Sequence, residues 1–233
     1  MGREHARLGR VPAVLGVDGC PGGWVGALVD GSQLTWHCGP FGAMLDLPAQ
    51  VVAVDIPIGL PAGGERRRAD LEARAALGPQ RSSVFLTPPR VVLDAPTQAE
   101  ATLLSRAAGS AGVSIQTFYL LGKVAEVDGL LRADPAAAAR TVEAHPEVSL
   151  RRLGGRVLPP KRTLEGGLAR LEVLRTWLPD LVLPDPLPGR AQPDDCLDAV
   201  ACAWSAHRWL EGTAETLGAA EHDELGTPMR IVV

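Results

Sequence analysis

The sequence predicts an α/β domain in which helices cover both faces of a mixed β-sheet. Short β-branched apolar runs fill the first quarter of the chain, whereas longer segments of good helix formers, separated by Gly and Pro, dominate the rest. A meander of three strands followed by strand–helix crossovers is typical of a sheet with both antiparallel and parallel pairs.

The strands are predicted from their apolar patterns. We expect them at residues 13–18, 23–30, 33–38, 50–55 and 140–144, with a short last strand at 229–233. Asp30-Gly31 is a two-residue hairpin signal, so the second and third strands are expected to pair. Residues 50–55 have no polar face, which is typical of a strand covered on both sides.

Helix-forming segments with Gly and Pro between them follow the fourth strand. Helices are expected at residues 65–77, 97–108, 115–132, 163–178 and 194–211. A proline-rich connector spans residues 180–193, and nothing long enough to fold separately follows it. We therefore expect one domain over residues 12–233, behind an N-terminal extension of residues 1–11.

Composition and charge restrict the classes of function. The 233 residues include 23 basic and 27 acidic ones, and the net charge of −4 gives no general positive field, so nucleic acid would need a local basic patch. The four cysteines, at positions 20, 38, 196 and 202, lack zinc-ligand spacing. No apolar run reaches the roughly 18 residues of a membrane span, and no secretory pattern is present. A cytoplasmic protein with reduced thiols and no membrane partner is expected, and its oligomeric state stays open.

Carboxylates at strand ends are the main chemical signal. Asp18 and Asp55 each end an apolar strand beside a Gly/Pro turn, and Glu143 ends the fifth strand. Asp195 and Asp198 are three apart, so they share a face of the last long helix. Ligand crevices of open α/β sheets form at the carboxyl ends of strands. Several carboxylates meeting there would repel one another unless cations neutralise them, which indicates Mg²⁺ or Mn²⁺.

Simpler structural interpretations exist for the same residues. A lone aspartate at the end of a strand is often a turn former. Asp195 and Asp198 are also well placed to cap their helix and complement its dipole. His145 either orients a metal-bound water or fills a turn before Pro146.

Seven motifs in order resemble the DUF429 family, described as predicted nucleases with a ribonuclease H-like fold. They are GVDGCPGGW (16–24), DIPIGLP (55–61), RSSVF (81–85), PPR (88–90), SIQ (114–116), EAHPEVS (143–149) and DDCLDA (194–199). The resemblance implies a ribonuclease H-like mixed five-stranded sheet, with a meander of three strands plus parallel strands. It also implies a two-metal site with Asp18, Asp55, Asp195 and Asp198 as ligands. Glu143 matches the family's own E-x-H-P-E motif and joins these four as a candidate catalytic residue.

Basic residues gather in two segments, 66–90 and 151–162. The candidates for gripping a nucleic-acid phosphate are Arg67, Arg74, Arg90, Lys123, Lys161 and Arg162. A solvated surface is the simpler interpretation of each, and for Lys123 an ion pair with Glu126. Lys123 and Lys161 are the chain's two lysines, against 21 arginines.

Three classes of function follow from these patterns. The first is a metal-dependent nuclease that hydrolyses phosphodiester bonds with two Mg²⁺ or Mn²⁺ ions. The second is a non-catalytic module that binds a small anion or a protein in the same crevice. The third is a phosphotransferase related to actin-like ATPases, suggested by Asp18-Gly19 followed by Gly22-Gly23, although the chain has no room for the second domain that such enzymes need.

Overall fold

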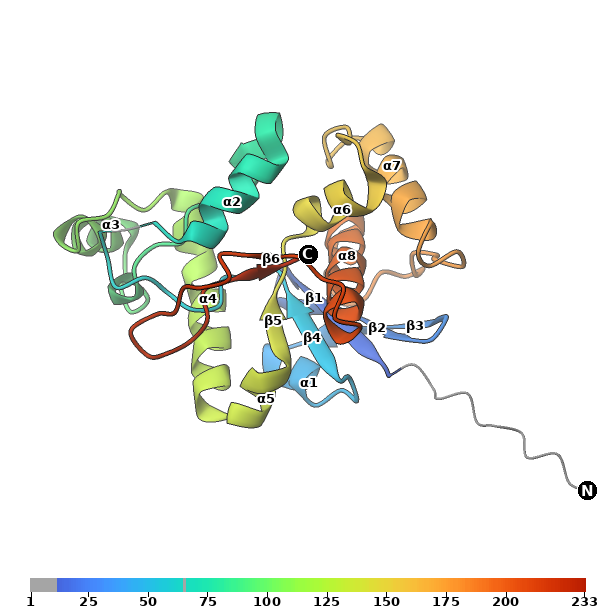
Figure 1. The fold of residues 1–233 in the computed structure, drawn as a ribbon, viewed down its shortest axis with the longest axis horizontal. Helices are drawn as coiled ribbons and strands as arrows, with labels where there is room; N and C mark the ends of the chain where they lie inside the picture. Colours follow the sequence, from blue (N-terminus) through green and yellow to red (C-terminus); the bar gives the residue numbers. More distant parts are fainter. Residues whose placement is uncertain (1–11, 65) are drawn as a thin grey trace, which may run out of the picture.

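A mixed sheet of five strands forms the centre of the computed structural model, which describes residues 12–64 and 66–233 (Figure 1). The predicted extension, residues 1–11, lies outside the described residues. The strands are β1 (Val14–Cys20), β2 (Gly23–Asp30), β3 (Gln33–Gly39), β4 (Val51–Val54) and β5 (Thr141–Glu143). Their order is β3-β2-β1-β4-β5. The β1–β2 and β2–β3 pairs are antiparallel, whereas β4 lies parallel to both β1 and β5. The predicted mixed sheet and its meander are confirmed.

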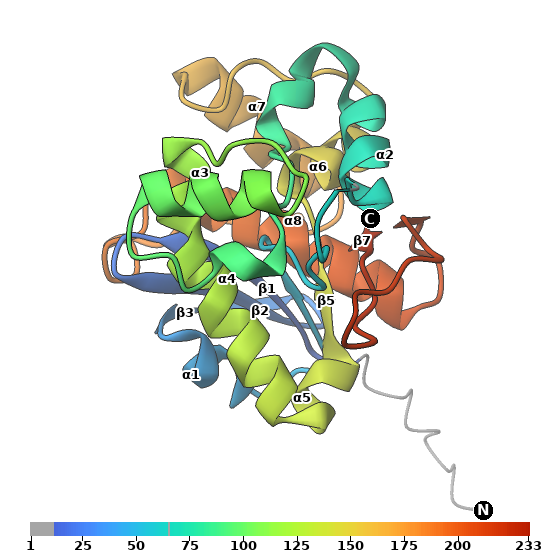
Figure 2. The same cartoon turned by 90° about the vertical axis from the view of Figure 1, so that its left-hand side faces the viewer.

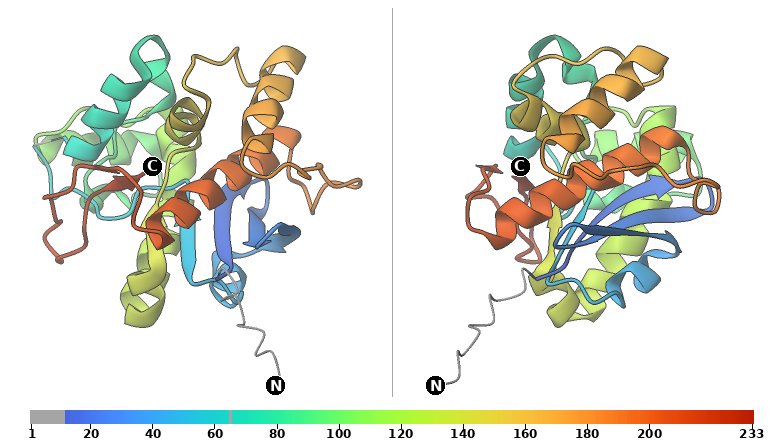
Figure 3. Two further views of the ribbon diagram at one scale, coloured as in Figure 1. Left: turned by 45° about the vertical axis from the view of Figure 1, so that its right-hand side comes forward. Right: turned by 90° about the vertical axis from the view of Figure 1, so that its right-hand side faces the viewer.

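Helices cover both faces of the sheet. On one face lie α1 (Phe41–Leu45), α4 (Ile115–Ala133) and α5 (Pro135–Arg140), which pack on Leu15, Val17, Val52 and Val54. On the other face lies α8 (Pro193–Leu210), backed by α6 (Pro146–Gly154) and α7 (Leu164–Arg175). Figure 3 shows α8 crossing the strands on its side of the sheet. The apolar runs without a polar face thus become strands buried on both sides.

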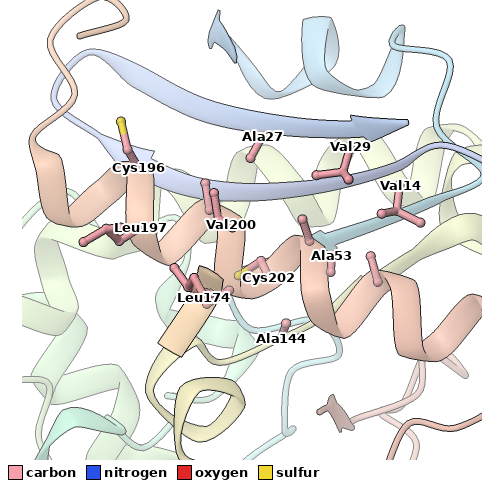
Figure 4. Close-up of a cluster of buried hydrophobic side chains, with 14 of the residues drawn as sticks. Val14, Ala27, Val29, Ala53, Ala144, Leu174, Cys196, Leu197, Val200 and Cys202 are labelled. Atoms are coloured by element: carbon pink, nitrogen blue, oxygen red, sulfur yellow. The ribbon is translucent and has the colours of Figure 1, made fainter. Parts of the chain in front are cut away.

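The close contact between α8 and the sheet depends on Gly16. A Cβ atom on Gly16 would lie 1.9 Å from the carbonyl oxygen of Ala199 and 2.1 Å from the nitrogen of Ala203. The helix backbone therefore rests directly on β1, at a point where a side chain has no room. Figure 4 shows the surrounding cluster, in which Val200 and Cys202 of α8 lie beside Ala27, Val29 and Ala53 of the sheet.

The remaining elements lie between β4 and α4 and at the end of the chain. They are α2 (Arg68–Leu77), the 3-10 helices η1 (Gly78–Ser83) and η2 (Arg90–Val92), α3 (Gln98–Ala107), β6 (Thr216–Leu217) and β7 (Ile231–Val232). Figure 2 shows α4 crossing its face of the sheet, with α3 beside the end at which α4 begins. In the described part of the chain, none of the helices has the length and apolar character needed to cross a membrane.

Three features differ from the elements expected from the sequence. The helix expected from residue 65 begins at Arg68. The last strand, β7, pairs with β6 in a small separate sheet and touches the main sheet through a bridge between Val232 and Ala144. Two helices that were not predicted, α5 and α6, begin at Pro135 and Pro146, because proline suits the first helical turn, where its missing N–H is not needed.

Candidate active site

Asp18 lies on the face of β1 that α8 covers, beside the first turns of that helix. It follows Gly16 by two residues, a distance of about 6–7 Å along a strand. One turn of helix covers about 5.4 Å. Because Gly16 fixes α8 near Ala199, the preceding turn of α8, which carries Asp195 and Asp198, comes to lie beside Asp18. The close packing of helix and strand therefore brings these carboxylates together.

A cleft opens at the carboxyl ends of β1 and β4. Its inner part, about 200 Å³, is lined by Asp18 and Lys123, and its outer part, about 510 Å³, by Lys161 and Asp198. Both parts share three lining residues, Asp55, Ser83 and His145. We call this the carboxylate cleft. Asp55 reaches it directly after β4, where its backbone N–H donates to the carbonyl oxygen of Val17 at 3.0 Å.

Burial and mutual repulsion raise the pKa values of the carboxylates of the cleft. Asp18 is only 8% exposed, and burial raises its pKa well above the ordinary value, with further increases from the charges of Asp55 and Asp198. Burial likewise raises the pKa of Asp55. Burial raises the pKa of Asp198 to about 7, although the neighbouring Lys161 ammonium lowers it. The three carboxylates therefore lie close enough to destabilise one another's charged forms.

Asp195 and Asp198 have different roles within α8. Asp195 accepts a hydrogen bond from the backbone N–H of Gln192 at 2.8 Å and so closes a capping box at the start of the helix. Asp198 is 2% exposed, and its Oδ2 accepts from Nζ of Lys161 at 2.7 Å. Its Oδ1 is buried without a hydrogen-bond partner. Asp195 thus has the helix-capping role that was the simpler interpretation of the pair, whereas Asp198 has one carboxylate oxygen without a partner.

The cleft has the type of ligand that a hard divalent cation prefers, but its side chains are not arranged around a common point. No three of the described Asp, Glu, His and Cys side chains are arranged to hold a metal ion as they stand. Like charges repel in the absence of a cation, and Lys161 draws Asp198 toward itself. The donors are nevertheless carboxylate oxygens from three separate elements, and the buried Oδ1 of Asp198 lacks any compensating group. Mg²⁺ and Mn²⁺ prefer such ligands, so we judge that the residues fit.

Glu143 lines the inner part of the cleft and belongs to a buried ion pair. Its Oε2 accepts from Arg67 at 2.6 Å and from the backbone N–H of Ile58 at 2.8 Å. Burial raises the pKa of Glu143 to about 8, while the charge of Arg67 lowers it. The side chain of Arg67 is 0% exposed and also donates to Thr87. Arg67 therefore has no surface left for a substrate phosphate, contrary to the expectation from the sequence.

Arg90 and Arg74 are also engaged within the protein. Arg90 pairs with Asp128 at 2.6 Å and with Asp223 at 2.7 Å, which ties the C-terminal loop to α4. Both terminal nitrogens of its guanidinium are thereby used, so Arg90 too differs from the expected phosphate contact. Arg74 is half-buried and donates to the carbonyl oxygen of Val84 at 2.9 Å.

The two lysines both border the carboxylate cleft. Lys123 donates to the carbonyl oxygen of Gly23, and its Nζ lies 4.3 Å from the ring centroid of Trp24. Glu126, the alternative partner considered for Lys123, instead accepts from Trp24 Nε1 at 2.9 Å. Lys161 contacts Asp198 in the outer part of the cleft. Its neighbour in the chain, Arg162, is exposed.

Two cleft residues were absent from the set of candidates. Glu147 lines the outer part of the cleft and is held by Arg170, whose Nε and second terminal nitrogen donate to its carboxylate at 2.9 Å each. Glu147 lies two residues after His145 in the same motif, which was the available signal. Nothing local marks Arg170, which is 2% exposed and reaches the cleft from α7. His145 is half-buried, and its Nδ1 has no hydrogen-bond partner.

A second cavity, of about 570 Å³, lies at the outer edge of β5. Its walls come from α4, α5 and the C-terminal loop, and Pro57 and Glu143 separate it from the carboxylate cleft. It is larger than either part of the cleft taken singly, but its wall is mostly apolar and lacks the group of repelling carboxylates. The cleft, rather than this cavity, therefore has the features of a reactive site.

These features define an α/β protein with buried carboxylates in a cleft at the carboxyl edge of its sheet. The chain belongs to the DUF429 family, described as a protein of unknown function, whose model matches residues 16–223. The match includes every carboxylate of the cleft. No curated protein and no solved structure matches the chain.

Proposed function

We propose that this protein is a divalent-metal-dependent hydrolase of nucleic-acid phosphodiester bonds, built on a ribonuclease H-like sheet. The strand order, with an antiparallel meander followed by two parallel strands, supports the proposed fold type. One observation carries the proposed function: buried Asp18, half-buried Asp55 and buried Asp198 come from three elements and line one cleft at the carboxyl edge. Such an arrangement is unfavourable for folding without a cation, so a role in binding one explains it.

The side chains of the cleft have separate roles in this proposal. Asp18, Asp55 and Asp198 would hold Mg²⁺ or Mn²⁺, with Asp198 using its free Oδ1. When bound, the metal supplies Lewis-acid polarisation of a phosphoryl oxygen and a water of lowered pKa. His145 lines both parts of the cleft and would orient a water there, while its Nδ1 is buried without a hydrogen-bond partner. Arg170 fixes Glu147 in the wall of the outer part of the cleft.

The mouth of the cleft supports a polyanionic substrate. The two basic segments noted in the sequence meet there, because Gln80 Nε2 donates to the carbonyl oxygen of Leu158 at 2.9 Å. Arg81, which follows Gln80, and Arg162, four residues after Leu158, are both exposed. Lys161 and Lys123 add positive charge along the cleft, and Arg74 lies behind η1. With a net charge of −4, contact with nucleic acid is confined to such a patch.

A substrate panel tests the proposal. Single-stranded DNA, duplex DNA, RNA–DNA hybrid and a branched junction are incubated with wild type and Asp18→Asn, with Mg²⁺, with Mn²⁺ and with chelator. We expect cleavage that needs the ion. Replacing a residue that only supports a metal ligand typically lowers activity roughly 10–100-fold. Asp18→Asn removes a ligand itself, so its cleavage activity should fall by more than that.

Asp46→Asn is the matched control for this experiment. Asp46 is exposed after α1, before β4 begins, and so lies at the opposite edge of the sheet from Asp55. The control variant should cleave as wild type does. Equal activity in wild type and Asp18→Asn would contradict the proposed mechanism. Metal binding without cleavage of any substrate would favour the alternative, a module that binds a small anion or a partner protein.

A further inference from the structure

Lys161 lies within the carboxylates of the cleft and not at its rim. Its Nζ is 2.7 Å from Oδ2 of Asp198 and 3.9 Å from Oδ2 of Asp194. The same ammonium interacts electrostatically with Asp18 and Asp55. A single cation of the chain is therefore shared by carboxylates from β1, from the end of β4 and from α8.

The loop that carries Lys161 is held firmly against α7. Arg170 donates to the carbonyl oxygen of Pro159 at 2.8 Å, and Thr163 Oγ1 donates to that of Pro160 at 2.8 Å. Gly166 allows close contact, since a Cβ there would lie 2.0 Å from the Pro160 oxygen. The side chain of Lys161 is 38% exposed, yet the carbonyl groups of the two prolines before it are held by hydrogen bonds. The ammonium is thus a built-in part of the cleft.

The choice of lysine has a chemical consequence. An arginine would present a planar fork able to engage both oxygens of Asp198, whereas an ammonium is a compact point charge. Lys161 bonds Oδ2 alone and leaves Oδ1 of Asp198 buried without a partner. The chain has 21 arginines and two lysines, so a lysine at this position is a departure from its usual basic residue. One oxygen of Asp198 therefore faces a fixed cation while the other stays available to a second one.

Charge balance then limits how many ions the cleft takes. Asp195 is committed to the cap of α8. Glu143 and Glu147, which also line the cleft, are balanced by Arg67 and Arg170. The carboxylates that remain belong to Asp18, Asp55, Asp194 and Asp198, and with the ammonium groups of Lys123 and Lys161 they leave two negative charges. One divalent ion neutralises them, whereas two would leave a strong excess of positive charge in a buried site.

We propose that Lys161 takes the place of a second metal ion, so that the cleft binds one divalent cation and the lysine ammonium acts as the other positive charge. This inference rests on the proposed function, and it replaces the two ions expected from the sequence with one. Lys161 would then supply the second positive charge to the scissile phosphate.

The test counts Mn²⁺ ions bound to the full chain, by titration calorimetry and by electron paramagnetic resonance of free Mn²⁺. Wild type should bind one ion, and Lys161→Met should bind two, because its carboxylates lose their internal counter-charge. Arg162→Met is the matched control, as it removes an exposed neighbouring charge, and it should bind one. Circular dichroism checks folding, and Lys161→Gln serves as a second variant if the first is unfolded.

Each other result decides against one part of the proposal. Two ions in wild type would overturn the role of Lys161 and leave the metal-dependent function standing. One ion in wild type and one in both folded Lys161 variants would also overturn it. No binding in wild type or in any variant would reject the proposed metal-dependent function together with this inference.

Discussion

Glu143 and Arg67 form an ion pair that protein encloses on nearly all sides. The pair joins β5 to the first residue before α2, and the bond from Ile58 adds the loop after β4. A buried ion pair gains little over an apolar pair, but loss of one partner leaves a charge without compensation. Glu143 thus connects three segments at the wall of the inner part of the cleft, a structural role that its place at the end of a strand did not reveal.

Arg67→Met should therefore destabilise the protein strongly. It leaves the Glu143 carboxylate buried without its cation, which costs about 3–5 kcal/mol in comparable pairs. The double variant Arg67→Met/Glu143→Gln should recover at least half of this loss, since Gln keeps an oxygen for the Ile58 N–H and removes the charge. Urea unfolding measures both. A single variant as stable as wild type would show that the pair contributes nothing to folding.

Among the secondary-structure elements, α8 is the one whose position determines the cleft. The helix meets β1 where Gly16 has only a hydrogen, and its Ala199 and Ala203 face that point. Larger residues at Gly16, or at Ala199 and Ala203, would push α8 away from β1. Asp198 would then move away from Asp18. Packing in the core and geometry of the carboxylates are thus set by the same contact.

Gly16→Ala tests this dependence. Because the added Cβ would lie about 2 Å from the α8 backbone, neither a rotamer change nor a flexible neighbour relieves the overlap. We expect a cost at or above the upper end of the roughly 1–3 kcal/mol typical of overpacking, seen as a fall in Tm of roughly 6 °C or more.

Gly129→Ala provides the matched control for that substitution. Gly129 lies within α4, and a Cβ there meets nothing within 4 Å. The same chemical change should stabilise the protein by roughly 0.5–1 kcal/mol, since alanine is the better helix former. Equal effects of the two substitutions would show that Gly16 does not set the position of α8.

For the molecule as a whole, the sequence predicted the sheet better than the surroundings of the cleft. Apolar runs and turn residues are local signals, so the meander and both parallel strands could be predicted. The rule that ligands gather at strand ends also predicted that Asp18 and Asp55 lie at one edge. It could not show that Arg67 points inward, because an arginine beside a helix start has the same pattern in either case. Nor could it place Lys161, whose loop is positioned by Arg170 from a different helix.

The stability of the whole protein should fall as pH rises from about 5 to about 8. Burial raises the pKa values of Asp18 and Asp55, and that of Asp198 to about 7. Over this range the folded chain keeps protons that the unfolded chain has released, so the free energy of unfolding decreases with pH. Tm measured at several pH values checks the direction.

Two comparisons isolate the contribution of the cleft from that of other titrating groups. Asp18→Asn should flatten the decrease in Tm with pH, because the amide carries no charge to desolvate, whereas Asp46→Asn should keep the wild-type slope. Added Mg²⁺ should raise Tm more at pH 8 than at pH 5.5, since the ion binds ionised carboxylates. A slope that Asp18→Asn leaves unchanged would contradict the assignment to the cleft.

The scarcity of lysine has a practical consequence. Since Lys123 and Lys161 are the chain's two lysines and each lines one part of the cleft, the cleft holds every side-chain primary amine of the protein. Reductive methylation with isotope-labelled formaldehyde would give two side-chain NMR signals, each reporting on one end of the cleft. Ions, nucleotides and inhibitors could then be screened by chemical shift, with no engineered label and before any substrate is known.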